Sequence, residues 1–134
     1  MTKGRLHHVE LWVPDLNRAT ASLGWLLEAL GYAPEQSWDH GRSWILDDTY
    51  IVVEQSPALS GEIHDRLKPG LNHLAFHAGS TSEFERIVSE ALEHGWELLF
   101  ADKHPYAGGS DHLAGYLTNA DGFEVELVAN FPTE

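Results

Sequence analysis

Residues 6–13 read Leu-His-His-Val-Glu-Leu-Trp-Val, and half a chain later residues 71–78 read Leu-Asn-His-Leu-Ala-Phe-His-Ala. In both stretches apolar and polar side chains alternate, which is the pattern of a half-buried β-strand. His8 of the first stretch aligns with His73 of the second. A repeat of this length indicates a duplicated supersecondary unit.

A helical pattern follows each of these strands. Asp15 is the expected N-cap of a helix that ends near Leu30, with Gly31 as its C-terminal glycine. Ser80 and Glu83 form a predicted capping box for a helix in the second half. Short strand-like runs come next, at 43–46 and 49–54 in the first half and at 96–100, 113–118 and 123–128 in the second.

Each half is therefore predicted to be a βαβββ unit, and the predicted fold class is α+β. We expect one domain over residues 1–134. It consists of a module at 5–55, a connector at 56–70 with two Pro and two Gly, and a module at 71–129.

The composition excludes several classes of function. A net charge of −13 argues against nucleic acid and anionic membranes as partners, since both are bound through basic patches. No apolar run approaches the length of a membrane span, and the N-terminus lacks the apolar segment of a signal peptide, so we expect a cytoplasmic protein. There is no Cys, so any metal must be held by carboxylates and by some of the nine His.

Candidate ligands gather on the sheet face that does not pack against the helices. Strand periodicity places His8 and Glu54 on this face in the first half, and His73 and Glu126 in the second. If the repeat brings the two sheets together, these four side chains could converge on one ion. Two imidazoles and two carboxylates suit Ni, Co, Zn, Mn or Fe(II).

The chain resembles the vicinal oxygen chelate superfamily, the family of glyoxalase I, bleomycin resistance proteins and extradiol dioxygenases. The resemblance lies in His-Val-Glu-Leu-Trp-Val-Pro-Asp-Leu from His8, in Gly-Leu-Asn-His-Leu from Gly70, and in Asp-Gly-Phe-Glu-Val-Glu-Leu-Val from Asp121. It implies that the two βαβββ modules pair into a cup-shaped half-barrel. It also implies that the metal ligands of glyoxalase I fall on His8, Glu54, His73 and Glu126.

This resemblance implies a metal-dependent lyase or isomerase that acts on a small oxygenated molecule. Glyoxalase- or epimerase-like proton transfer would pass through a metal-bound enediolate, with Glu54 or Glu126 as the base. The substrate pocket is predicted to include Trp12, Tyr50, His77 and Tyr106. We expect a homodimer, because two small open modules leave sheet surface to cover.

Two alternatives stay open. The first is an Fe(II) extradiol ring-cleaving dioxygenase that uses His8, His73 and Glu126 as ligands, with His112 and Tyr116 as acid/base groups beside them. The second is a metal-free drug-binding or resistance protein. Its aromatic cup would contain Trp12, Trp38, Trp44 and Tyr106.

The segment 102–112 is the long insertion of the second half. Two His, one Tyr and a Gly pair suggest a loop that covers the site, in the manner of a lid.

Overall fold

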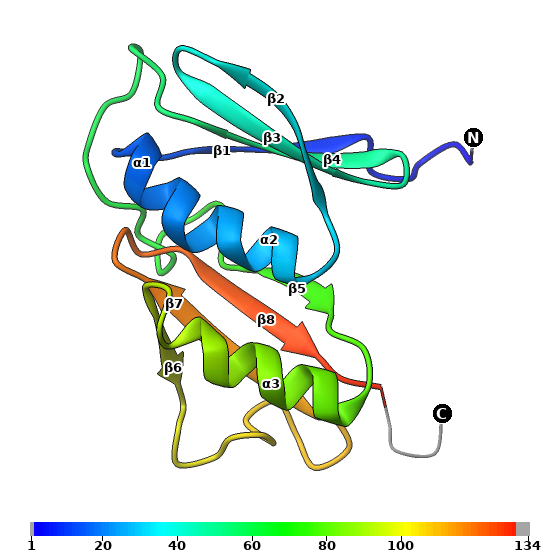
Figure 1. Ribbon diagram of the computed structural model, residues 1–134. Coiled ribbons are helices and arrows are strands. Elements are labelled where there is room, and N and C mark those ends of the chain that lie inside the picture. The colour runs from blue at the N-terminus through cyan, green and yellow to red at the C-terminus, as the bar shows by residue number, and fades with distance from the viewer. Residues whose placement is uncertain (1, 131–134) are drawn as a thin grey trace. The chain divides into compact units, whose positions relative to one another are not determined.

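Two four-stranded sheets form the framework of the chain. The computed structural model describes residues 2–130 (Figure 1), so the ends of the predicted domain, residue 1 and residues 131–134, lie outside the described part. The chain divides into two compact units with a boundary between Ile63 and His64.

The first unit contains one sheet with helices between its first two strands. Its elements are β1 (His8–Trp12), α1 (Leu16–Ala19), α2 (Trp25–Ala29), β2 (Ala33–Trp38), β3 (Gly41–Leu46) and β4 (Thr49–Glu54). The strand order is β1-β4-β3-β2, with β1 parallel to β4 and the other pairs antiparallel.

The second unit repeats this arrangement. Its elements are β5 (Leu74–His77), α3 (Thr81–Ala91), β6 (Trp96–Leu99), β7 (Ala114–Asn119) and β8 (Glu124–Val128). The order β5-β8-β7-β6, with β5 parallel to β8, matches the first sheet strand for strand. The predicted α+β fold with two βαβββ modules is thus confirmed, while their pairing into a cup stays a prediction.

The predicted helix starts are also confirmed. The side chain of Asp15 accepts a hydrogen bond from the backbone N–H of Arg18 at 2.8 Å. Ser80 and Glu83 form a complete capping box at the start of α3. Gly31, just past α2, has a φ of 102°, a left-handed conformation that glycine adopts without strain.

The first helical segment differs from a regular helix at a π-helical turn, Thr20–Gly24, between α1 and α2. Gly24 within this turn packs against the indole of Trp44, and a Cβ at residue 24 would lie 2.6 Å from Trp44 Cζ2. The hydroxyl of Thr20 also bonds back to the Leu16 carbonyl at 2.7 Å, which favours a local distortion of the helix. The π-helical turn therefore leaves room in the core for the indole of Trp44.

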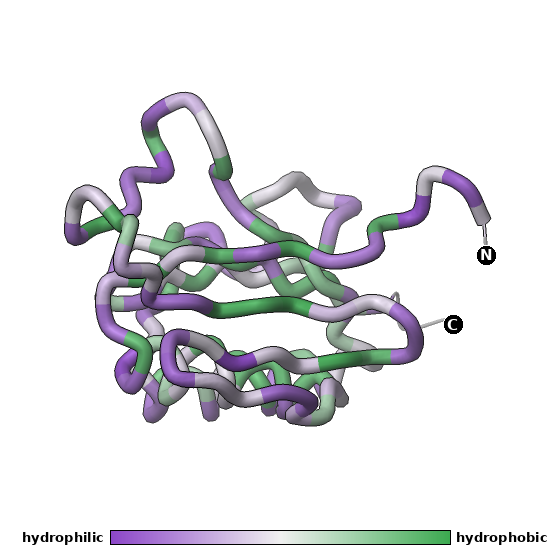
Figure 2. Tube along the Cα trace, turned by 90° about the horizontal axis from the view of Figure 1, so that it is seen from above, coloured by the Kyte–Doolittle hydropathy of each residue, from purple (hydrophilic) through white to green (hydrophobic). Residues whose placement is uncertain are grey.

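Strand β2 was not predicted. Every residue of Ala33–Trp38 is exposed, so this strand lacks the alternation that reveals the others. Along the trace, hydrophilic and hydrophobic residues follow one another at short intervals (Figure 2).

One face of each sheet is covered by the helical segments of its own unit. In the second unit Phe84, Ile87 and Val88 of α3 are buried, as are Val125 and Leu127 of β8. The opposite face of β8 carries Glu124 and Glu126, both at 7% exposure. Within residues 2–130 no helix has the length and apolar character that a bilayer crossing requires.

Candidate functional site

A buried carboxylate forms the centre of the candidate site in the second unit. Glu126 lies on β8, between β5 and β7. Its Oε1 is 3.0 Å from Nε2 of His73, which immediately precedes β5, and its Oε2 contacts Nε2 of His112, which precedes β7. Tyr116 is the direct partner of Glu126 across the β7–β8 pair and also hydrogen-bonds to its carboxylate. The structure therefore brings His73, His112, Tyr116 and Glu126 together.

The hydrogen bonds of this cluster decide the charge of Glu126. Burial by itself would raise the pKa of the carboxyl, but hydrogen bonds from His112 and His73 favour the ionised form and leave the pKa of Glu126 below its ordinary value. The pKa of Tyr116 is raised by burial first and by the negative charge of Glu126 second. At neutral pH the site thus contains an ionised carboxylate beside a protonated phenol.

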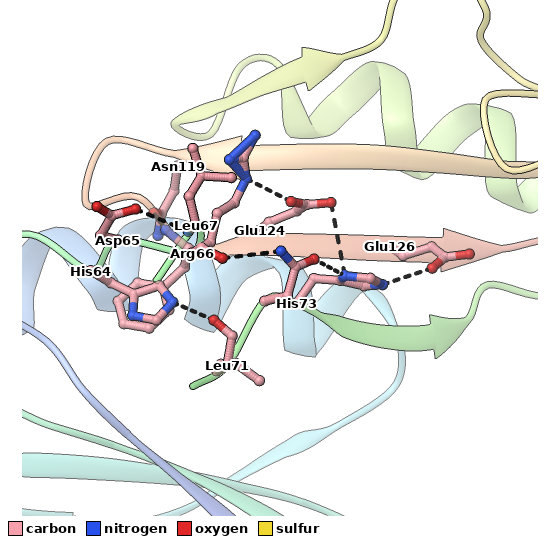
Figure 3. A network of polar contacts seen from close by, with 11 residues as sticks. His64, Asp65, Arg66, Leu67, Leu71, His73, Asn119, Glu124 and Glu126 are labelled. Atoms are coloured by element: carbon pink, nitrogen blue, oxygen red, sulfur yellow. Dashed lines mark hydrogen bonds and ion pairs between the residues drawn. The ribbon is translucent and has the colours of Figure 1, made fainter. Parts of the chain in front are cut away.

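A second buried carboxylate, that of Glu124, lies two residues before Glu126 on β8. Oε1 of Glu124 accepts from Nε of Arg66 at 2.6 Å, and its Oε2 is 4.0 Å from Nδ1 of His73. Figure 3 shows Arg66, Glu124, His73 and Glu126 in sequence along this face. Arg66 lies in the predicted connector, so part of that segment belongs to the second unit.

The predicted lid, 102–112, packs against the cluster at its tip. A Cβ at Gly108 would lie 2.6 Å from the Tyr116 hydroxyl and 2.7 Å from Cδ2 of His112. On the other side of the sheet, the ring of His104 stacks on Phe84, and burial lowers the pKa of His104. The loop is therefore anchored in the core and touches the two side chains that contact Glu126.

In the first unit, the predicted ligands have other contacts. The ring of His8 stacks on Tyr50 at 4.8 Å, and its Nδ1 is 2.9 Å from Nδ1 of His7. Oε1 of Glu54 accepts from Nε1 of Trp38 at 3.3 Å. His8 pairs with Tyr50 and Trp12 with Glu54, so His8 and Glu54 lie four positions apart, about 13 Å along the strands. The structure does not bring these two side chains together within the unit.

The predicted pocket residues lie in both units, and each unit gives them contacts of its own. Trp12 is 42% exposed and donates to Glu10 at 2.6 Å, and Tyr106 is 52% exposed on the loop. His77 lies at the end of β5 opposite Val128. Over residues 2–130, neither a hydrogen bond nor a ring contact joins His77 or Tyr106 to the cluster.

The prediction that Trp44 lines an aromatic cup is wrong. Trp44 is 3% exposed, packs on Gly24 and donates from Nε1 to Glu28 at 3.0 Å. It is a core residue because β3 turns this side chain toward the helices. Trp44 therefore cannot line a drug-binding cup.

Asn72 belongs to the site but is not among the predicted site residues. Its Oδ1 is 2.6 Å from Nδ1 of His73. Its position next to a predicted ligand His was the available signal, because such His residues usually bond through their second nitrogen to a neighbouring acceptor.

The donor types of the cluster fit a divalent metal ion. Two imidazole nitrogens and a carboxylate are ligands that Mn, Fe, Co, Ni and Zn accept. In the described part of the chain, however, no three His, Asp or Glu side chains are already spread into a metal-binding arrangement. His73, His112 and Glu126 are instead hydrogen-bonded to one another.

Comparisons with known proteins agree on one family. Residues 7–116 match the sequence pattern of the Glyoxalase/Bleomycin resistance protein/Dioxygenase superfamily. The uncharacterised protein YqjT of Bacillus subtilis is 42% identical over 126 residues, which cover 92% of this chain and 98% of YqjT.

Solved structures show the same fold. A candidate glyoxalase from Bacillus halodurans is 39% identical and superimposes with a TM-score of 0.89, over 96% of this chain and 97% of its own. The fosfomycin resistance protein FosX of Listeria monocytogenes, in complex with Mn(II) and sulfate, is 19% identical with a TM-score of 0.64, over 100% and 98% of the two chains.

Proposed function

The chain belongs to the glyoxalase/bleomycin resistance/dioxygenase superfamily, the vicinal oxygen chelate superfamily, and on that premise we propose that it is a metal-dependent enzyme of glyoxalase or epimerase type. Its substrate would be a small molecule with oxygens on adjacent carbons, and its reaction a proton transfer at one of these carbons. The observation that carries the proposal is the buried Glu126 carboxylate between two imidazoles.

His73 and Glu126 are the proposed metal ligands in the second unit. A divalent ion held there would polarise the substrate oxygens and make the adjacent C–H bond more acidic. FosX, which shares the fold, binds Mn(II), so Mn(II) is the first ion to test. His8 in the first unit stays a ligand prediction, to be judged by the metal content of its variant. The carboxylate of Glu54 is hydrogen-bonded to Trp38, so we expect the metal content not to depend on this residue.

The side chains around Glu126 suit a proton transfer. The lowered pKa of Glu126 keeps its carboxylate ionised, which a base requires at neutral pH. The imidazole of His112 contacts Glu126, and its side chain is 41% exposed, so it connects the buried carboxylate to water. Tyr116 holds the carboxylate in place from β7.

The test combines metal analysis with proton exchange. Protein purified without chelator is compared with Glu126→Gln and with a matched control, Glu97→Gln, which changes an exposed carboxylate of β6. We expect about one transition-metal ion per chain in the wild type and the control, and none in Glu126→Gln. Small 2-hydroxycarbonyl compounds in D₂O should exchange their Cα proton with the first two proteins only. Full exchange by metal-free Glu126→Gln would refute the proposal.

One observation favours a second candidate, the Fe(II) extradiol dioxygenase. His112 and Tyr116 both contact Glu126, which is where acid/base groups for ring cleavage would be needed. This candidate predicts iron as the bound metal and oxygen uptake with catechol after anaerobic loading with Fe(II). Proton exchange without oxygen uptake would exclude it.

The predicted homodimer and cytoplasmic location are further proposals. Light scattering of the purified protein measures the first, and fractionation of the source cells measures the second.

A further inference from the structure

The side-chain amide of Asn72 connects a backbone carbonyl to the ring of His73. Its Nδ2 donates to the Arg66 carbonyl at 3.1 Å, and its Oδ1 faces Nδ1 of His73 at 2.6 Å. The first distance is typical of an N–H···O hydrogen bond, and the second is a short one. Glu124, the other acceptor near Nδ1, is too distant at 4.0 Å.

The Arg66 carbonyl determines which way the amide points. A carbonyl oxygen can only accept, so the Asn72 atom that faces it must be the NH₂ group. Oδ1 is then the atom that faces His73. An amide oxygen is also only an acceptor, so Nδ1 of His73 must carry a proton.

The segment that contributes the Arg66 carbonyl is held firmly against the second unit. The backbone N–H of His64 donates to the Asp121 carbonyl at 3.0 Å, and its Nε2 donates to the Leu71 carbonyl at 2.9 Å. The ring of His64 stacks on Phe123 with centroids 4.6 Å apart. Figure 3 shows the bond between the His64 ring and the Leu71 carbonyl. The acceptor for Asn72 is thus in a fixed position.

From this geometry we propose that Asn72 is a positioning residue that selects the metal-binding nitrogen of His73. Both ring nitrogens face an acceptor, Oδ1 of Asn72 and Oε1 of Glu126. Asn72 retains the proton on Nδ1, so the proton that a cation replaces is the one on Nε2. His73 then presents its Nε2 lone pair next to Glu126, and the ring cannot turn over without losing the Asn72 bond.

The part of this inference that concerns metal binding rests on the proposed function. The part that concerns the Nδ1–H tautomer of His73 does not. Two variants separate positioning from loop support. Asn72→Leu removes both hydrogen bonds of the amide. Asn72→Asp retains an acceptor for Nδ1 but loses the donor to the Arg66 carbonyl.

The first readout is Mn(II) affinity, measured by calorimetry. Asn72→Leu should bind about 10- to 100-fold more weakly, the usual loss for a missing partner of a ligand His. Asn72→Asp should bind at least as tightly as the wild type. If both variants lost the same affinity, Asn72 would only support the loop, and the proposal would be overturned.

The second readout is the protonation of the His73 ring, from two-bond ¹H–¹⁵N spectra. With Zn(II) bound, we expect a proton on Nδ1 and the metal on Nε2, and the reverse assignment contradicts the proposal. The metal-free Glu126→Ala variant removes the competing acceptor, so its neutral His73 ring should be the Nδ1–H tautomer. This last measurement decides the role of Asn72 even if the wild type binds no metal. A wild type that binds no metal would refute only the proposed function.

Discussion

Val52 of the first unit occupies the position that Glu126 occupies in the second. Val52 is the register partner of Glu10 on β1, and Glu126 is the register partner of Ala75 on β5. The two sheets have the same strand order, and Glu10 and Ala75 are equivalent in the repeat. Where the second unit has a buried carboxylate, the first therefore has a buried apolar side chain, and Glu54 lies two residues farther along β4.

The position of Glu54 leads to a prediction about metal content. Its carboxylate is hydrogen-bonded to Trp38, four positions along the strands from His8. We expect Glu54→Gln to retain the metal content of the wild type, measured by elemental analysis beside Glu126→Gln. Loss of the ion in Glu54→Gln would restore the four-ligand site implied by the resemblance to glyoxalase I.

Gly108 controls the space around the cluster. A methyl group at this position would lie 2.6 Å from the Tyr116 hydroxyl, so Gly108→Ala must displace Tyr116 or His112. We expect a loss of about 10- to 100-fold in the rate of proton exchange, since small displacements of reacting groups are costly.

Gly109→Ala is the control for this variant. Gly109 has a φ of 127° and open space around its Cβ, so alanine there strains the loop without touching the cluster. It should lower thermal stability and leave the rate per folded molecule unchanged. Equal rates for the Gly108 and Gly109 variants would show that the contact with Tyr116 has no role.

The ion pair of Arg66 and Glu124 should contribute to folding stability. The side chain of Glu124 is 6% exposed and that of Arg66 is 23% exposed, so Arg66→Met leaves a buried carboxylate without its cation. We expect a loss of about 1–3 kcal/mol in the free energy of unfolding, measured with urea. The same change in a Glu124→Gln background should cost less, and an equal cost would mean that the two side chains are not coupled.

Strand periodicity was sufficient to predict the cluster of the second unit. It placed Glu126, Tyr116 and His112 on one sheet face, and the structure joins them. It could not establish that Val52, not Glu54, corresponds to Glu126, because the segment 102–112 makes the second module longer than the first. Register depends on hydrogen bonds between strands, which a single sequence does not reveal.

Contacts between side chains could not be predicted from the sequence either. Aromatic residues on strands suit either face of a sheet, so the sequence does not separate a cup residue from a core residue at Trp44. Its 3% exposure and the close approach of Gly24 place Trp44 in the core. The hydrogen bond of Asn72 to the Arg66 carbonyl depends on how the connector folds back. Its fold is not encoded in any periodic pattern.

The capping box of α3 predicts a pH dependence of stability. Hydrogen bonds from the Ser80 backbone and hydroxyl lower the pKa of Glu83 below its ordinary value of 4.5. A carboxyl whose pKa is lower in the folded state binds its proton more weakly there. Its contribution to stability is therefore complete above the unfolded pKa and is lost as the pH falls through the folded pKa.

Glu83→Gln can still accept in the capping box but does not titrate. Urea unfolding of both proteins between pH 7 and pH 3 measures the effect. The wild type should be the more stable at pH 7, and the difference should shrink as Glu83 becomes protonated. A difference that stays constant over this range would mean that the charge of Glu83 adds nothing to the helix cap.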